Sequence, residues 1–245
     1  MQETPRIPDG LSIIAFGDVH GCLNELQDLL DRVEAHAAVR PERRYIVISL
    51  GDLIDRGTDS AGVIERLVEG VPGCETIMLR GNHEQMMLDF IDASSNEQQW
   101  GRIGCFETMA SYGIDARRVL SERLPLAQVR QALPDLRRAF LAKLPAYHLN
   151  FLRNTPLHVT FGDYFFVHAG VRSYVALDRQ DPQDLLWIRG EFLDFPGDFG
   201  KKIVHGHSPC DEIEFRPNRI NLDTGVCLGG PLSAVLFEGA QATIF

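Results

Sequence analysis

Residues 46–57 read Ile-Val-Ile-Ser-Leu-Gly-Asp-Leu-Ile-Asp-Arg-Gly, and this stretch decides the fold. Its first half is a run of apolar and β-branched residues, which is typical of a strand buried on both faces. Asp52, Asp55 and Arg56 follow directly after the strand. Open α/β sheets bind their ligands at this carboxyl edge, although a polar turn with a local Asp–Arg pair is the alternative. The stretch indicates a site if other strands end in the same way.

Two other strands in the first ninety residues end in the same way. Residues 11–16 lead into Gly-Asp-Val-His-Gly at 17–21, and residues 75–79 lead into Arg-Gly-Asn-His-Glu at 80–84. Apolar residues at helical spacing follow each of the three strands. Three strand–helix units predict a parallel or mixed sheet, with the polar strand ends meeting at one edge.

The rest of the chain has a different pattern. Residues 93–157 are predicted to form a helical insertion over one end of the sheet, where they hold substrate, bind a partner or only cover apolar surface. Strands are expected to return as an antiparallel series from residue 158 to the end, with an apolar run at 185–188 that closes on Arg189. Because no repeat or clear linker is found, residues 1–245 are expected to form a single domain.

Composition narrows the class of function. The chain has 245 residues and a formal net charge of -10, which argues against broad nucleic-acid binding. No apolar run is long enough to cross a bilayer, and the first residues do not resemble a signal peptide. The five cysteines are scattered and form no CxxC pair, as expected in a reducing cytosol. We therefore expect a cytoplasmic protein without nucleic-acid or membrane partners; the pattern carries no information on oligomeric state.

The polar residues at the strand ends combine oxygen and nitrogen donors. Two divalent ions that share one carboxylate need about this number of mixed donors, and Mn, Fe or Zn accept such a set. A single Asp-x-His pair, by contrast, often forms only a hydrogen bond. The candidate metal ligands are Asp18, His20, Asp52, Asn82, His168 and His207.

Five motifs follow one another along the chain: Gly17–Gly21, Gly51–Gly57, Leu79–Glu84, Val167–Gly170 and Gly206–Pro209. In this order they resemble the motifs of the phosphoprotein phosphatases, a branch of the calcineurin-like metallophosphoesterases, and the short chain is closer in size to bacterial and phage members. The resemblance covers residues 13–237 and is weakest across the helical insertion. It implies an α/β fold in which two mixed β-sheets form a sandwich flanked by helices (α-β-β-α).

The resemblance also implies the roles of the metal ligands. Asp18 and His20 would hold the first ion, Asp52 would bridge both, and Asn82, His168 and His207 would complete the second. Two divalent ions, Mn²⁺ by preference and otherwise Fe or Zn, would then activate a bridging hydroxide for in-line attack on phosphorus.

Four further residues are candidates for catalysis. Arg56 and Arg189 resemble the phosphate-binding arginines of the family, and Asn82 is expected beside the phosphate. His83 is expected to protonate the leaving group with Asp55 as its orienting partner, unless His83 is only structural.

The choice of substrate rests on three positions. Pro209 stands where many metallophosphodiesterases have a further histidine, while Asp55 and Glu84 differ from the residues common in symmetrical dinucleoside tetraphosphatases. These differences favour a Ser/Thr protein phosphatase that acts on phosphorylated proteins or peptides. The alternative is a symmetrical diadenosine-tetraphosphate hydrolase, and a third hypothesis is an inactive phospho-binding scaffold.

Overall fold

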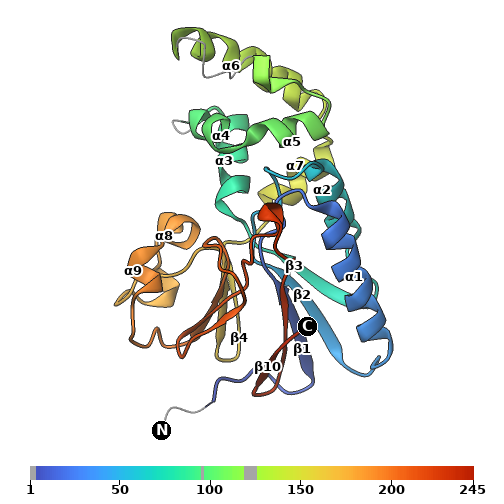
Figure 1. Ribbon diagram of the computed structural model, residues 1–245, viewed down its shortest axis with the longest axis vertical. Coiled ribbons are helices and arrows are strands. Elements are labelled where there is room, and N and C mark those ends of the chain that lie inside the picture. Colours follow the sequence, from blue (N-terminus) through green and yellow to red (C-terminus); the bar gives the residue numbers. More distant parts are fainter. Residues whose placement is uncertain (1–3, 95–96, 119–125) are drawn as a thin grey trace.

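The computed structural model describes residues 4–94, 97–118 and 126–245, and its described strands form two five-stranded sheets (Figure 1). The first sheet has the order β10-β9-β1-β2-β3. The three strands from the first half of the chain, β1, β2 and β3, run parallel to one another. The C-terminal strand β9 pairs antiparallel with β1, and β10 pairs antiparallel with β9. These strands are β1 (Leu11–Phe16), β2 (Arg44–Ser49), β3 (Cys74–Met78), β9 (Ala234–Glu238) and β10 (Gln241–Ile244).

The second sheet has the order β4-β5-β6-β8-β7. Strands β5, β6 and β8 are parallel, and only the edge strands β4 and β7 pair antiparallel. The expected antiparallel series is therefore wrong for this part of the chain, because the helices and loops between these strands return the chain to the same end of the sheet. The strands are β4 (His158–Phe161), β5 (Tyr164–Val167), β6 (Lys202–His205), β7 (Glu214–Phe215) and β8 (Arg219–Asn221).

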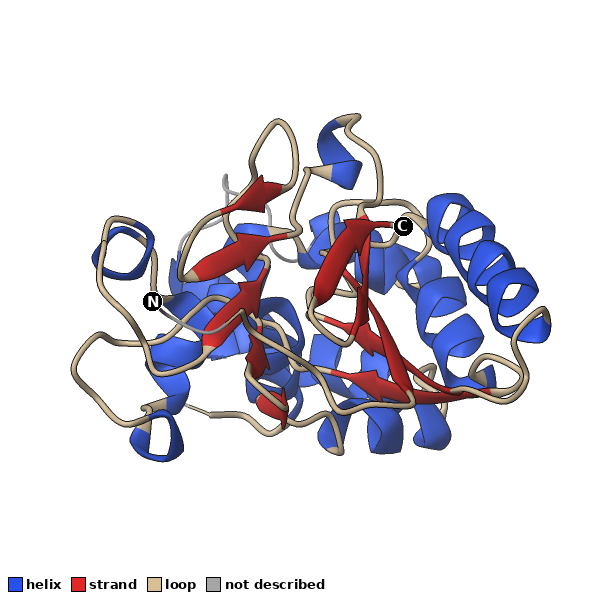
Figure 2. Ribbon diagram, turned by 90° about the horizontal axis from the view of Figure 1, so that it is seen from below, coloured by secondary structure: helices blue, strands red, loops and turns tan. Residues whose placement is uncertain are grey.

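Helices cover the outer faces of both sheets, which gives the α-β-β-α sandwich (Figures 1 and 2). Helices α1 (Leu23–Ala38) and α2 (Ser60–Glu69) pack on the first sheet, and α8 (Pro182–Trp187) and α9 (Gly190–Leu193) pack on the second. The apolar run before Arg189 lies largely in α8 and is not a strand, because Asp181 accepts the Gln183 N–H and caps a helix that Pro182 begins.

Alternation along β1 explains how one strand serves two cores. Ile13 and Ala15 face the second sheet and pack in the apolar layer that contains Phe166. Ile14 and Phe16 face the opposite way, into the layer formed with the helices. All of these side chains are fully buried, so residues 13–16 form a continuous apolar run, as residues 46–48 do in β2.

Between β3 and β4 the described residues are helical, and several of these helices rise beyond the end of the sheets (Figure 1). A buried aromatic cluster joins Phe90 of α3 with Trp100 of α4 and Phe140 of α6; their ring centroids are 5.4 to 6.5 Å apart. Pro134 lies inside α6, and the helix continues past it. Residues 95–96 and 119–125 of the insertion predicted at 93–157 lie outside the described residues. The helices are α3 (Asn82–Ile91), α4 (Glu97–Ile103), α5 (Cys105–Ser111), α6 (Leu126–Leu141) and α7 (Ala146–Arg153).

Three short 3-10 turns complete the described elements, at Ala116–Arg118, Leu177–Arg179 and Val226–Leu228. Among the described residues, no helix has both the length and the apolar composition to cross a membrane.

Candidate metal centre

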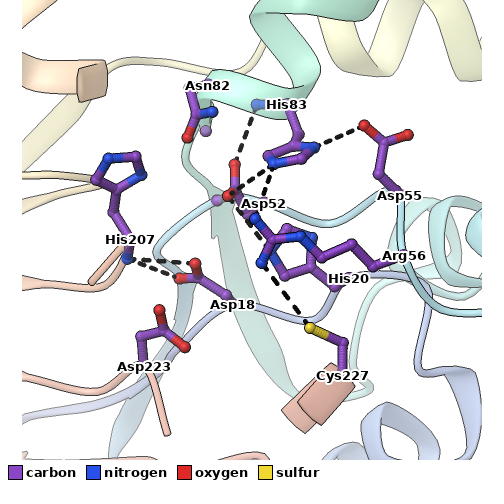
Figure 3. A network of polar contacts seen from close by, with 12 residues as sticks. Asp18, His20, Asp52, Asp55, Arg56, Asn82, His83, His207, Asp223 and Cys227 are labelled. Carbon is purple, nitrogen blue, oxygen red and sulfur yellow. Dashed lines mark hydrogen bonds and ion pairs between the residues drawn. The ribbon is translucent and has the colours of Figure 1, made fainter. Parts of the chain in front are cut away.

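The polar residues that follow β1, β2, β3, β5 and β6 meet where the carboxyl ends of the two sheets come together (Figure 3). The loops that carry them are tied to each other by backbone hydrogen bonds. The Asp52 carbonyl accepts the N–H groups of Val19 and His20 at 3.0 and 2.8 Å, and the His20 carbonyl accepts the Gly57 N–H at 2.8 Å. The first two motifs of the sequence therefore form one rigid double loop.

Two groups of donors share the Asp52 carboxylate. His20, Asp52 and His83 form one group, and Asp52, His168 and His207 form the other, with ligand atoms within 4.8 Å of one another in each. In the second group, His168 Nε2 lies 3.3 Å from Asp52 Oδ1 and 3.1 Å from His207 Nδ1. A shared carboxylate between two donor groups is the arrangement expected of a two-metal site.

Asn82 and Asp18 lie beside these groups in different ways. Asn82 Oδ1 is 2.9 Å from His168 Nε2, so the amide oxygen belongs with the second group. Both carboxylate oxygens of Asp18 accept the His207 N–H at 3.2 Å. In the first group, the ligand atoms within 4.8 Å of each other include His83 and not Asp18. The site therefore brings together all six expected ligands, but in a grouping that differs from the expected one.

The imidazoles are arranged to receive cations. His20 Nδ1 lies 2.9 Å from the Ile54 carbonyl and His168 Nδ1 lies 2.9 Å from the Leu50 carbonyl, so each Nδ1–H donates to the backbone and each Nε2 presents its lone pair to the site. Nε2 of His20 and Nε2 of His207 are buried and have no hydrogen-bond partner among the described residues. Such nitrogens are costly to bury unless a ligand uses them, and they fit divalent cations such as Mn, Fe or Zn.

Burial favours the neutral form of these side chains. Burial lowers the pKa of His20 to about 3, which keeps its ring neutral near pH 7. Burial, followed by the neighbouring His168, lowers the pKa of His207 to about 2. Burial and the carboxylates of Asp223 and Asp52 raise the pKa of Asp18. Neutral imidazoles beside crowded carboxylates are the environment in which a bound cation relieves repulsion.

Backbone strain is concentrated at the same place. Seven described residues other than glycine have a positive φ, and five of them belong to the site. Each such residue costs about 1–3 kcal/mol, so the fold keeps this backbone only where the surrounding contacts hold it. These backbone conformations turn the side chains of tight loops toward a common centre. The five are His20 (φ 46°), Asp52 (49°), Asp55 (72°), Arg56 (67°) and His207 (66°).

Glu84 fixes the position of the loop that carries Asp52. The carboxylate is fully buried and accepts the N–H groups of Asp52 at 2.9 Å, Leu53 at 2.8 Å and Ile54 at 3.3 Å, together with that of Gly81 at 2.8 Å. A Cβ at Gly81 would lie 2.2 Å from the Asp52 nitrogen, so only glycine allows this approach. Glu84 therefore supports the loop and does not face the centre.

Replacing Glu84 by glutamine is expected to destabilise the fold. The NH₂ group of glutamine would face backbone N–H groups that donate to the carboxylate in the native protein. Buried donors that have no acceptor cost about 1–3 kcal/mol. We expect the free energy of unfolding to fall by about 2 kcal/mol or more in urea titrations. The matched control is Glu69→Gln, on the exposed end of α2, which should leave the unfolding midpoint unchanged. Equal midpoints for both variants would contradict the assigned role.

His83 and Asp55 form the shortest of the ion pairs that involve a site histidine. His83 Nδ1 lies 2.6 Å from Asp55 Oδ2, and both side chains are buried. Burial lowers the pKa of His83, but the carboxylates of Asp52 and Asp55 outweigh burial, and the net pKa is raised. The ring also lies edge-on to His20, at 4.8 Å between centroids, and its Nε2 is 3.8 Å from Asp52 Oδ2. A histidine held in this way presents Nε2 to the centre.

The two candidate phosphate-binding arginines lie beside different donor groups. Arg56 Nη2 is 3.4 Å from His83 Nε2, beside the first donor group. Arg189 Nη1 lies 3.1 Å from Ser208 Oγ, next to His207, and its charge lowers the pKa of both His168 and His207 after larger effects of burial. Both arginine residues are exposed, so each guanidinium is accessible to an anion from solvent.

One carboxylate of the site was not assigned a role from the sequence. Asp223 follows β8, is 3% exposed and points toward Asp18 (Figure 3). It follows a strand and precedes Thr-Gly, so the strand-end pattern that identified Asp18 and Asp52 also applies to it. Trp100 and Thr108, whose side chains contact Asp55, belong to none of the sequence motifs, and no local signal marks them as part of the site.

Comparison with known families agrees with this geometry. The model of the calcineurin-like phosphoesterases matches residues 11–229, which is most of the chain. The chain belongs to the calcineurin-like phosphoesterase family. This confirms the expected superfamily and its sandwich of two mixed sheets. The family hydrolyses phosphoesters with divalent metal ions, and the two donor groups around Asp52 are candidate positions for such ions in this member.

Curated relatives of this calcineurin-like phosphoesterase carry a more specific name. A bis(5'-nucleosyl)-tetraphosphatase PrpE [asymmetrical] of Oceanobacillus iheyensis is 26% identical over 248 residues, covering 93% of this chain and 89% of the relative. The protein of the same name from Bacillus thuringiensis is 28% identical, with coverage of 91% and 89%. The names of these relatives describe hydrolysis of a bis(5'-nucleosyl) tetraphosphate and specify asymmetrical cleavage.

Solved structures show that the fold is shared by proteins with different named substrates. A crystal structure named as a candidate diadenosine tetraphosphatase superposes with a TM-score of 0.61 at 21% identity, covering 96% of this chain and 92% of the other. A cold-active protein-tyrosine phosphatase of a Shewanella species gives 0.55 at 15% identity, covering 99% and 81%. At these identities the comparison concerns the fold alone.

Proposed function

We propose that this chain is a metal-dependent hydrolase of dinucleoside polyphosphates. The observation that carries the proposal is the match along nearly the whole length of both chains to relatives named asymmetrical bis(5'-nucleosyl)-tetraphosphatases. The shared carboxylate and the unpartnered imidazole nitrogens support a hydrolytic two-metal centre. A chain that keeps all of these donors is a poor candidate for an inactive scaffold.

The proposed ligands of the two ions follow from the donor groups. His20 and Asp52 would hold one ion with Asp18 nearby, and His168 and His207 would hold the other with Asn82 and Asp52. When bound, divalent ions supply Lewis acidity and a nucleophile at neutral pH. Mn²⁺ remains the preferred prediction, with Fe or Zn as alternatives, because the donors mix oxygen and imidazole nitrogen.

The protein side chains then bind and orient the substrate. Arg56 and Arg189 each offer a planar fork of N–H donors, which suits phosphoryl oxygens. A chain of four phosphates carries several negative charges, so cationic groups beside different donor groups can bind different phosphates of one substrate. His83, held by Asp55, presents Nε2 to the centre and would donate a proton to the leaving oxygen.

The test of this proposal is product analysis. With Mn²⁺ and diadenosine tetraphosphate, asymmetrical cleavage yields AMP and ATP, whereas symmetrical cleavage yields two ADP. We expect AMP and ATP in equal amounts, with a kcat/KM at least roughly ten-fold above that for a phosphoserine peptide, a margin that corresponds to about 1.4 kcal/mol in the transition state. Separation by ion-exchange chromatography measures both products. Phosphate release from the peptide at the higher kcat/KM would overturn the proposal.

One observation keeps a phosphomonoesterase as the second candidate. The short His83–Asp55 contact is typical of a histidine that acts as a general acid. A serine alkoxide needs a proton to leave far more than a departing nucleotide does. A nucleotide leaves as a phosphate whose second pKa is near 6, so it departs readily without protonation. A Ser/Thr protein phosphatase is therefore the second candidate, and the same assay distinguishes the two.

A further inference from the structure

The Asp55 carboxylate is surrounded by hydrogen-bond donors from three directions. Oδ2 accepts His83 Nδ1–H at 2.6 Å and also the indole Nε1–H of Trp100 at 2.8 Å. Oδ1 accepts the hydroxyl of Thr108 at 2.5 Å. Asp55, Trp100 and Thr108 are each 0% exposed, so water cannot replace these donors.

The Thr108 hydroxyl is itself held in one orientation. The hydroxyl donates a hydrogen bond to Asp55 Oδ1, and its oxygen accepts one from the Asp55 backbone N–H at 2.9 Å. Ser60 Oγ lies 2.9 Å from the same oxygen and 3.0 Å from the same N–H. Thr108 therefore holds both the backbone and the side chain of Asp55, at a residue whose φ of 72° is strained.

Trp100 is fixed by packing rather than by further polar contacts. Its ring centroid is 5.4 Å from that of Phe90 and 5.6 Å from that of Phe140, inside the aromatic cluster of α3, α4 and α6. Indole has a single N–H, which here reaches Asp55, so the ring keeps one orientation.

We propose that Trp100 and Thr108 are positioning residues that hold the Asp55 carboxylate so that His83 points its Nε2 at the leaving group. A buried carboxylate with one partner can rotate, and an imidazole bound to it would rotate with it. Because both oxygens of the Asp55 carboxylate accept hydrogen bonds, the carboxylate keeps one orientation, and its bond to His83 fixes the orientation of the imidazole ring. The proposal rests on the proposed hydrolase reaction and on His83 as the acid.

This assigns a role to the helices between β3 and β4. Trp100 comes from α4 and Thr108 from α5, both within residues 93–157, for which the sequence left three roles open. These two helices complete the support of a side chain on the β2 loop, 45 and 53 residues away in the chain. They act on the reaction through Asp55 without touching the substrate.

The test compares esters with good and poor leaving groups. Trp100→Phe and Thr108→Val each remove one hydrogen-bond donor to Asp55; valine keeps the shape of threonine, whereas phenylalanine is smaller than tryptophan. For each variant, kcat is measured with phenyl phosphate and with p-nitrophenyl phosphate in Mn²⁺. Phenol, with a pKa near 10, needs the acid, whereas p-nitrophenolate leaves unaided. We expect each variant to lose roughly 10-fold with phenyl phosphate and less than about 2-fold with p-nitrophenyl phosphate, since removing a group that orients a metal-ligating histidine costs about 10- to 100-fold in activity.

Two controls separate positioning from folding. Thr108→Ser keeps the hydroxyl and should restore the phenyl phosphate rate. Tyr112→Phe removes another buried hydrogen bond of the same cluster, 2.8 Å to His148, and should leave the ratio of the two rates unchanged. Metal content and melting temperature are measured for every variant.

The outcomes distinguish this proposal from the proposed function. Equal losses on both esters, or no rescue by Thr108→Ser, would overturn the positioning role while the hydrolase stands. A wild-type protein that hydrolyses neither the esters nor diadenosine tetraphosphate would overturn both. A selective loss that the serine variant restores supports the proposal.

Discussion

Replacing Asp52 by asparagine is expected to abolish turnover. Asp52 is the residue common to the two donor groups, with His20 Nε2 at 3.5 Å and His168 Nε2 at 3.3 Å from its two oxygens. The asparagine amide keeps one oxygen, which is a weaker metal ligand than a carboxylate oxygen, and it places an NH₂ group where a cation is expected. Because a catalytic metal contributes several kcal/mol, we expect kcat/KM to fall by at least about a thousand-fold.

The measurement is kcat/KM on diadenosine tetraphosphate together with metal content by plasma mass spectrometry. The bound metal should fall below two ions per chain in Asp52→Asn. The control is Asp31→Asn, an exposed residue of α1, which should keep both activity and metal. If Asp52→Asn retained full activity and two ions, Asp52 would not be the shared ligand.

Replacing His83 by asparagine should have the second largest effect, and the effect should depend on the leaving group. General acid catalysis contributes about 10²–10⁴-fold, so we expect a loss in that range with phenyl phosphate or phosphoserine peptides. The loss with diadenosine tetraphosphate should be smaller, because a nucleotide leaves as a phosphate. Rates on the two classes of substrate, measured with the same enzyme preparation, give the ratio directly.

Metal content decides between two roles for His83. Its Nδ1 is committed to Asp55 at 2.6 Å, but its Nε2 belongs to the donor group of His20 and Asp52. If His83 is the acid, the asparagine variant keeps both ions. If the bound metal falls together with the rate on every substrate, His83 is a ligand and the assignment as acid is wrong.

The strand ends explain why much of the site was predictable. Asp18 and Asp52 each follow an apolar strand of one sheet, and parallel strands bring such residues to one edge whatever the details of packing. His168 and His207 follow β5 and β6, which are also parallel, so the same rule applies in the second sheet. The pattern fails for the second sheet as a whole, because the direction of a short strand is not encoded in its own residues.

The two positions that favour a phosphomonoesterase in the sequence have structural roles beside the site. The Glu84 carboxylate accepts four backbone N–H groups and supports the loop of Asp52. The Asp55 carboxylate contacts His83 and orients its ring. Both supporting roles are compatible with more than one leaving group.

The amino-acid sequence by itself determined the strand–glycine–carboxylate units, the order of the five motifs and the family, because apolar periodicity and tight turns are local properties of the chain. Only the tertiary structure decided which donors share a position: His83 beside His20, Asp18 on the His207 N–H, and Trp100 and Thr108 on Asp55. Those contacts join residues 45 to 189 positions apart. They depend on how sheets and helices pack, and packing is a property of the whole chain rather than of any one segment.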